Sequence, residues 1–362
     1  MNFNTSKLSL GINMLTLGIE TSCDETAAAV IENGNTVLSS SVSSSVHLHS
    51  KFGGIVPEIA SRFHLEYIMP VVKTALKKAK VKISDISLIA VTYTPGLVGS
   101  LLVGISFAKA LSFSSKIPLI GVNHINAHLF SPFLKEKNFT FPFIGLVVSG
   151  GHTSLAYVRD FDKIKFVGRT RDDAAGEAFD KAAKILGLGY PGGPAIDKLS
   201  RQVSDSPFKL NCAQLKDTLD FSFSGIKTDV LYKSQKLKVK SPKEKAQLAY
   251  SFQQEVINSL VSKSIAACKK LKVNTLSVGG GVACNNLLRE TLWAQAKKEN
   301  IKVLLAEPQF CVDNAAMIGV LGYHLYKKGK KSNYKLTAQA TVKHRRQNSE
   351  DRKQNKKTKN KI

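Results

Sequence analysis

The chain has 362 residues, 43% of them apolar, which suggests two domains with sizeable cores. Its formal net charge of +25 favours a polyanionic partner, whose affinity would come mainly from phosphate contacts and fall with salt. No apolar run approaches the ~18 to 20 residues needed to span a bilayer, so the sequence predicts no membrane partner.

The charge is divided between a tail and the body. Residues 327–362 hold 14 Lys and Arg against 2 acidic residues, and the other 326 residues still carry +13. Either a solvated, disordered tail or an RNA-contacting one is compatible with this composition.

The cysteines are scattered and lack a Cys-x-x-Cys pair, which predicts a reducing, cytoplasmic location without disulfides or a thiolate zinc site. They are Cys23, Cys212, Cys268, Cys284 and Cys311.

The first half begins with residues 1–13, interpreted as a probable leader. A strand at 15–21, a polar turn at 22–26 and strands at 27–32 and 36–40 then predict a meander. A helix at about 58–79, a strand at 88–92 and a helix at 96–113 follow.

The second half repeats this plan. Strands are predicted at 143–148, 154–159 and 165–168, then a helix at about 243–271, a strand at 275–278 and a helix at 285–300. Two such copies predict two α/β domains, residues 14–135 and 136–330, facing each other across a cleft. A Gly-, Pro- and Ser-rich insert lies at about 189–241, and residues 331–362 are predicted to be a basic, disordered tail.

The most informative pattern is a pair of histidines, His124 and His128. Side chains at i and i+4 project from one face of a helix, so both imidazoles can reach one metal ion. Asp313, expected at a helix N-terminus, would complete a three-ligand set with open positions. Taken alone, the pair is more often structural, and Asp313 could simply cap its helix.

Glycine-rich turns accompany this pattern. Residues 149–153 (Ser-Gly-Gly-His-Thr) lie between two strands, where consecutive N–H groups form a nest for phosphate. Residues 279–281 follow a strand and open the helix containing Asn285, which suits an anionic or ribose group. Each motif alone also fits an ordinary turn.

A further acidic helix is predicted from residue 172 onward. Asp180 lies in its middle, where pairing with Lys184 at i+4 is favoured without further context. Residues 190–197 predict a tight turn that places backbone amides and Asp197 at the edge of a cleft.

Together these motifs resemble the universal tRNA threonylcarbamoyladenosine transferase family, whose members were once named glycoproteases. The resemblance covers residues 14–330 in order and in register. It is carried by residues 18–26, 53–62, 124–128, 148–153, 173–181, 221–225, 279–282 and 313–317.

The resemblance implies a duplicated actin-like (ribonuclease H-like) fold. It also implies transfer of L-threonylcarbamoyl from its adenylate to N6 of adenosine 37 in tRNA, with release of AMP. By family match His124, His128 and Asp313 hold one metal ion per subunit, Fe2+ in first place and Zn2+ as the alternative. The matched adenylate-binding positions are Val147, Val148, Ser149, Gly150, Gly151, Asp180, Gly193, Asp197 and Asn285. Asp24 and Glu25 are weaker, catalytic candidates near the same cleft, and no nucleophile is assigned.

The resemblance implies partners as well. These are tRNA, threonylcarbamoyl-adenylate, a paralogous TsaB-like non-catalytic subunit and a small TsaE-like ATPase. Two features depart from the family pattern: the loop before Pro95 is shortened, and the usual short C-terminal segment is replaced by residues 338–346 and the Lys-rich tail.

Three other functions remain as alternatives. A metallopeptidase needs a glutamate directly after its first histidine, and Ile125 stands there instead. An ATPase or sugar kinase of the actin-like superfamily would explain the glycine-rich turns but not the histidine pair. A non-catalytic RNA-binding protein would explain the charge alone.

Overall fold

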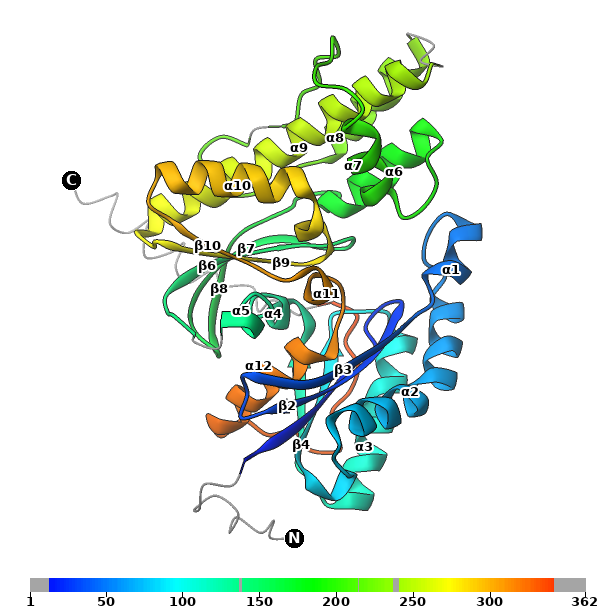
Figure 1. Cartoon of the computed structure of the whole chain (residues 1–362), viewed down its shortest axis with the longest axis vertical. Coiled ribbons are helices and arrows are strands. Elements are labelled where there is room, and N and C mark those ends of the chain that lie inside the picture. The colour runs from blue at the N-terminus through cyan, green and yellow to red at the C-terminus, as the bar shows by residue number, and fades with distance from the viewer. Residues whose placement is uncertain (1–12, 137–138, 214, 237–240, 342–362) are drawn as a thin grey trace, which may run out of the picture.

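The computed structural model describes residues 13–136, 139–213, 215–236 and 241–341. Two five-stranded sheets with identical strand plans form its framework, one above the other in Figure 1. In each sheet an antiparallel three-stranded meander is extended by two parallel strands. The duplicated α/β fold expected from the sequence is therefore confirmed.

The first sheet has the strand order β3-β2-β1-β4-β5. Its strands are β1 (Leu15–Glu20), β2 (Glu25–Glu32), β3 (Thr36–Ser44), β4 (Ile86–Thr94) and β5 (Leu119–Asn123). The helices of this half are α1 (Val46–His49), α2 (Pro57–Ala79), α3 (Val98–Ser115), α4 (His124–His128) and α5 (Phe133–Glu136), with 3-10 turns at Ser50–Phe52 and Ile83–Asp85. Helix α2 begins with Pro57 at its first position, where no N–H is needed, and ends at Lys80 in the left-handed conformation.

The second sheet has the order β10-β9-β6-β7-β8. Its strands are β6 (Phe143–Val148), β7 (Thr153–Asp160), β8 (Lys163–Arg169), β9 (Thr275–Gly279) and β10 (Lys302–Leu305). The remaining helices are α6 (Ala175–Leu186), α7 (Gly192–Ser200), α8 (Ser224–Lys236), α9 (Pro242–Leu271), α10 (Asn286–Lys298), α11 (Pro308–Cys311) and α12 (Ala315–Lys327), with a 3-10 turn at Gly281–Cys284. A capping box between Ser241 and Glu244 begins the 30-residue α9.

The two halves share an apolar core around α4. This cluster joins Ile120 of β5, Val147 of β6 and Met317 of α12, all buried. Phe130 and Phe143 meet edge to face within it, with ring centroids 5.8 Å apart. The short helix α4 is therefore held by side chains from both sheets.

Helix α12 departs from the predicted division of the chain. The predicted second domain, 136–330, includes it, but α12 packs against β1, β2 and β4 of the first sheet. Gly18 of β1 permits this contact, because a Cβ there would lie 2.2 Å from the carbonyl oxygen of Ala315. The chain thus returns to the first sheet at its last helix.

Both predicted terminal segments lie partly outside the described residues. Of the leader at 1–13, only Asn13 is described, and its side-chain amide donates to Glu32. Of the tail at 331–362, residues 331–341 are described and pack along the first sheet, which contradicts the disorder expected for that part.

Helix α3 corrects the expectation that no apolar run is long enough to span a bilayer. Among the described residues it is the one helix with the length and apolar composition of a span. It packs against α2, β1, β4 and β5, and 33% of it is buried. A single helix of this length and composition is weak evidence for a membrane span.

Candidate metal centre

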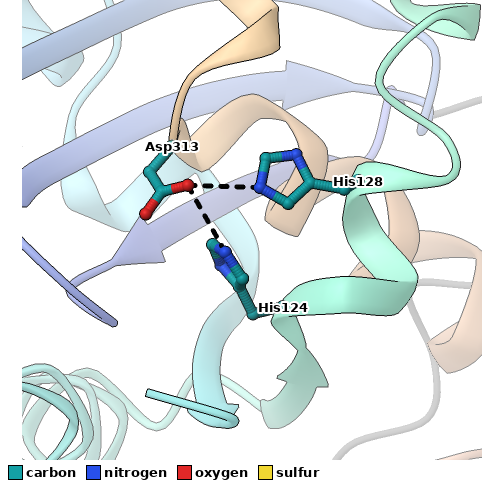
Figure 2. A group of neighbouring side chains, drawn as sticks. All are labelled: His124, His128 and Asp313. Atoms are coloured by element: carbon teal, nitrogen blue, oxygen red, sulfur yellow. Dashed lines mark hydrogen bonds and ion pairs between the residues drawn. The ribbon is translucent and has the colours of Figure 1, made fainter. Parts of the chain in front are cut away.

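Helix α4 carries the predicted histidine pair at its two ends. The helix starts directly after β5, and the side chain of Asn123 caps it by accepting from the N–H of Asn126 at 2.9 Å. His124 and His128 are buried, and their rings lie nearly perpendicular with centroids 4.6 Å apart. The i, i+4 spacing has brought both imidazoles to one side of the helix, as Figure 2 shows.

Asp313 meets this pair from the loop between α11 and α12. Its Oδ1 lies 3.2 Å from Nε2 of His128 and 3.4 Å from Nε2 of His124. Asn314, rather than Asp313, caps α12 by accepting from the N–H of Met317, so the aspartate carboxylate is free to face the histidines. The three ligand atoms lie within 4.8 Å of one another, an arrangement that can hold a metal ion.

Glu20 sets the orientation of His124. Its Oε2 lies 2.8 Å from Nδ1 of His124, and it also accepts from Thr92 Oγ1 at 2.7 Å. A carboxylate that accepts from Nδ1–H leaves the lone pair of Nε2 free for a metal, the usual arrangement around ligating histidines. The donor set therefore fits a metal ion.

Sequence patterns did not reveal Glu20, although one signal was present. Glu20 is fully buried at the end of β1, a strand that is otherwise apolar apart from Thr16. A glutamate in a buried strand is rare unless it has a partner. The sequence therefore indicates that Glu20 has a buried polar partner, but it does not indicate that this partner is His124.

The charges in the centre support one another. Burial lowers the pKa of His124, but the carboxylates of Asp313 and Glu20 outweigh it and raise that pKa well above its ordinary value. Burial raises the pKa of Asp313, while the two histidines outweigh it and hold that pKa far below its usual range. Burial keeps the pKa of His128 below its ordinary value. Asp313 is therefore a carboxylate, the form that binds a cation.

Asp24, in the turn between β1 and β2, and Glu25, the first residue of β2, lie near the same centre. Burial, then the charges of Asp313 and Asp24, raise the pKa of Glu25 to about 10. Glu25 is consequently protonated at neutral pH and can donate a hydrogen bond. Glu25 thus lies close enough to Asp313 for its charge to act on the pKa of Glu25, but the structure assigns neither candidate a chemical step.

The glycine-rich turn between β6 and β7 approaches the centre from the second sheet. Ser149 N–H donates to the carbonyl of His152 at 2.8 Å, and a Cβ on Gly150 or Gly151 would meet nothing within 4 Å. Burial, then the neighbouring imidazoles of His124 and His128, lower the pKa of His152 to about 4. The turn therefore opens towards free space beside the histidine pair.

The other two residues predicted in this segment are placed differently. Val147 and Val148 are fully buried in β6. Their side chains belong to the core, so only their backbone could contact a ligand.

Asp180 connects α6 to α7. Its Oδ1 accepts from the N–H of Gly192 at 2.7 Å, and the ion pair with Lys184 is absent from the described residues. Burial raises the pKa of Asp180, with smaller contributions from Glu177 and Asp24. Gly193, at the start of α7, has open space where a Cβ would be.

Asp197 of α7 and Asn285, the N-cap of α10, lie near each other in the second half. Asp197 Oδ2 accepts from Asn286 at 3.0 Å, while its buried Oδ1 has no hydrogen-bond partner among the described residues. Asn285 caps α10 through the N–H of Leu288 and donates to Gln253. In the described part of the chain neither side chain hydrogen-bonds to the three metal-ligand candidates.

Comparison with known proteins decides which family this arrangement belongs to. The family model described as TsaD, tRNA N6-adenosine threonylcarbamoyltransferase, matches residues 36–320. The chain belongs to the TsaD family. Curated relatives named tRNA N6-adenosine threonylcarbamoyltransferase include one from Clostridium kluyveri, 52% identical over 325 residues, which are 89% of this chain and 95% of the relative. Another, from Clostridium botulinum strain Hall, is 50% identical over 329 residues, 90% and 97% of the two chains.

Solved structures similar to this member of the TsaD family share its fold at low identity. Full-length HypF in a phosphate- and nucleotide-bound form has a TM-score of 0.58 at 14% identity, covering 89% of this chain and 56% of HypF. Component A of (R)-2-hydroxyglutaryl-CoA dehydratase from Acidaminococcus fermentans has a TM-score of 0.52 at 14% identity, covering 88% and 100%. These likenesses support the actin-like fold and carry no argument about function.

Proposed function

We propose that this chain transfers a threonylcarbamoyl group from threonylcarbamoyl-adenylate to N6 of adenosine 37 in tRNA and releases AMP. The observation that carries the proposal is the convergence of His124, His128 and Asp313 in a chain of the TsaD family. Relatives at 50 to 52% identity bear the name of this activity. The net charge of +25 suits a polyanionic substrate such as tRNA.

The reaction needs positioning more than a nucleophilic side chain. The donor is an activated mixed anhydride, so the adenosine amine can attack its carbonyl directly. Orientation of the two reactants supplies much of the lowering of such a barrier. The open turn at Gly150 and Gly151 would orient the phosphate through backbone N–H groups.

We further propose that His124, His128 and Asp313 hold one metal ion per chain, Fe2+ in preference to Zn2+. Two imidazoles and one carboxylate with open positions are a ligand set for either ion. When bound, the metal would supply positive charge that stabilises the developing negative charge of the departing phosphate. Glu20, whose Oε2 lies 2.8 Å from Nδ1 of His124, would hold that ring in the tautomer that ligation requires.

The remaining predicted residues form the proposed adenylate site. Gly193, where an added Cβ would meet nothing within 4 Å, leaves room for a ribose or adenine group, and the buried Oδ1 of Asp197 has no hydrogen-bond partner among the described residues. Asn285 would act through the N-terminus of α10, which its side chain already caps. Asp180 would act by holding the first N–H of α7.

The activity is proposed to depend on partner proteins in the cytoplasm. These are a paralogous TsaB-like subunit and a TsaE-like ATPase, as the resemblance implies. Leu65 of α2 and Phe113 of α3 are large apolar side chains that are 67% and 73% exposed, and either could contribute to such a contact.

The test is transfer to unmodified tRNA with purified adenylate and both partners present. Wild type should form threonylcarbamoyladenosine and AMP, whereas His128→Ala should lose both the metal and the transfer. His47→Ala, at an exposed histidine of α1, is the matched control and should retain both. Peptide or ATP hydrolysis that His128→Ala abolishes, without any modified tRNA, would replace this proposal with one of the rival functions.

A further inference from the structure

The 3-10 turn between α1 and α2 carries an exposed aromatic ring. We name this turn, Ser50–Phe52, the tip turn. Phe52 is 62% exposed, and Lys51 beside it is exposed too. Figure 1 shows α1 and the start of α2 at the edge of the first half that is nearest the second half in this view. The tip turn therefore presents an aromatic ring and a cation to solvent.

A buried histidine fastens the tip turn to the fold. His49 directly precedes the turn and is fully buried, and its Nδ1 accepts from the N–H of Val56 at 3.3 Å. Because a backbone N–H can only donate, the ring proton of His49 lies on Nε2, which donates to the hydroxyl of Ser45 at 3.0 Å. Consecutive Cα atoms are about 3.8 Å apart, so the Cα of Phe52 lies at most about 11 Å from that of His49.

Ser45 joins the tip turn to the surroundings of the metal centre. Its N–H and its hydroxyl both donate to the carbonyl of Asp24, at 3.0 and 2.9 Å. In the same turn between β1 and β2, the hydroxyl of Ser22 lies 3.2 Å from Nδ1 of His124. One short turn is therefore bonded to the tip turn at one residue and to a metal-ligand candidate at another.

The charge of this segment suits a polyanion. Residues 33–57 contain no Asp or Glu, and Lys51 is the one Lys or Arg among them. No carboxylate of the segment would therefore repel a phosphate beside Lys51. Proteins that bind single-stranded nucleic acids combine aromatic rings, on which bases stack, with cations that meet the backbone. Phe52 and Lys51 together fit an RNA strand with unpaired bases.

We propose that Phe52 stacks on an unpaired base of the tRNA anticodon loop while Lys51 contacts an adjacent phosphate. The inference rests on the proposed function, because it takes tRNA as the substrate. The bases of an RNA loop can be splayed out and stacked on aromatic side chains. Every base has a π-face, so such stacking tolerates differences in loop sequence. Phe52 thus holds the loop at the border of the metal centre while adenosine 37 reaches the donor.

The first test measures binding of an unmodified anticodon stem-loop RNA to the full chain over a range of salt concentrations. Phe52→Ala should weaken binding about 5- to 150-fold, the usual effect of removing one stacked ring. The slope of log K against log salt should stay unchanged in this variant, because no charge is lost. Lys51→Gln should instead lower that slope by about 0.7, the value for one phosphate contact of a single strand.

Two control variants accompany this series. Phe52→Tyr keeps the ring and should bind as wild type does. Phe113→Ala removes a ring that is 73% exposed on α3, outside the tip turn, and should also bind as wild type does.

A second series identifies the stacked base. The loop bases of the RNA are removed one at a time, which leaves an abasic ribose at each position. At the position that stacks on Phe52, wild type should lose as much affinity as Phe52→Ala loses with the intact RNA. Phe52→Ala should lose nothing further with that abasic RNA, because both changes remove the same contact.

Several results would overturn the inference. Unaltered RNA binding by Phe52→Ala would remove this ring from RNA recognition, and so would a wild-type chain that binds no stem-loop RNA with or without the partner proteins. Equal losses for Phe52→Ala and Phe113→Ala would show a general effect of exposed rings. Additive losses at every abasic position would make the tip turn structural. Weaker partner binding by Phe52→Ala, with RNA binding unchanged, would make Phe52 a protein contact.

Failure of this inference and failure of the proposed function can be told apart. Transfer is assayed separately on wild type with the adenylate and both partners present. Absence of transfer refutes the proposed function, while the binding series still decides whether Phe52 contacts RNA.

Discussion

Glu20 and His124 are joined by a hydrogen bond across the first sheet, with Oε2 of Glu20 2.8 Å from Nδ1 of His124. The glutamate comes from the end of β1 and the histidine from the start of α4, 104 positions apart in the chain. Because both side chains are buried, no solvent competes for either group.

Replacing Glu20 with glutamine should weaken metal binding with the fold intact. Glutamine keeps an acceptor oxygen but removes the negative charge that makes the imidazole a stronger ligand. Loss of such a partner costs roughly 10- to 100-fold in metal affinity. Competition with a metal-binding dye measures the change. Glu58→Gln, at an exposed glutamate of α2 paired with Arg62, should bind as wild type does. Equal affinities for the two variants would refute the role of Glu20.

Gly18→Ala should disturb the metal centre through α12. An added Cβ would lie 2.2 Å from the Ala315 carbonyl and 2.8 Å from the Gly319 nitrogen, so α12 must move. Overpacking of this kind costs about 1–3 kcal/mol of unfolding free energy. Asp313 directly precedes α12, so metal affinity should fall too. Gly54→Ala, where a Cβ meets nothing within 4 Å, is the control. Urea unfolding measures the stability of both variants. Unchanged stability of Gly18→Ala would contradict this packing.

Cys284 should be the most reactive thiol of the described chain. The hydrogen bond with Cys311 lowers the pKa of Cys284 to about 7, assisted by the charge of Arg289 and opposed by burial. Burial raises the pKa of Cys268 to about 12. The rate of iodoacetamide alkylation should therefore rise to half its maximum near pH 7, and Cys284→Ser should abolish this fast reaction. Persistence of the fast reaction in that variant would assign it to another cysteine.

Burial of His324 should make the folded state less stable in mild acid. Its ring stacks on Phe161 at 3.8 Å and lies 3.0 Å from the Gly34 carbonyl. Burial lowers its pKa from 6.5 to about 4. The unfolded chain therefore binds this proton first as the pH falls. The stability that His324 contributes above pH 6.5 is lost between 6.5 and 4, at no more than about 1.4 kcal/mol per pH unit.

His324→Gln tests this pH dependence. Unfolding free energies measured from pH 7.5 to 4.5 should fall less steeply for the variant than for wild type. The exposed His47→Gln variant should follow the wild-type curve. Parallel curves for His324→Gln and wild type would show that this histidine does not titrate as its burial implies.

Local patterns predicted most of the fold. The helix expected at 58–79 is Pro57–Ala79, and the one expected at 243–271 is Pro242–Leu271, because proline starts and periodic apolar faces mark such helices directly. The i, i+4 spacing likewise predicted that His124 and His128 share one face.

Relations between distant segments could not be predicted in the same way. Glu20 pairs with His124 because two elements meet in space, and no sequence spacing encodes that meeting. The packing of α12 on the first sheet depends on the close approach of Gly18 to Ala315. A glycine in a strand does not by itself predict such an approach. The packing of residues 332–341 on the first sheet could not be predicted from their polar composition, since hydrogen bonds to Gly121 and Tyr93 hold this segment as well as apolar burial.

The proposed function requires one metal ion, held by His124, His128 and Asp313, for threonylcarbamoyl transfer. The requirement is tested by titrating metal-free protein with Fe2+ in the presence of the partners, adenylate and unmodified tRNA. Bound metal and modified adenosine are then measured in the same samples. Both should rise together and level off at one ion per chain. Transfer at the full rate before any metal is bound would contradict the metal requirement.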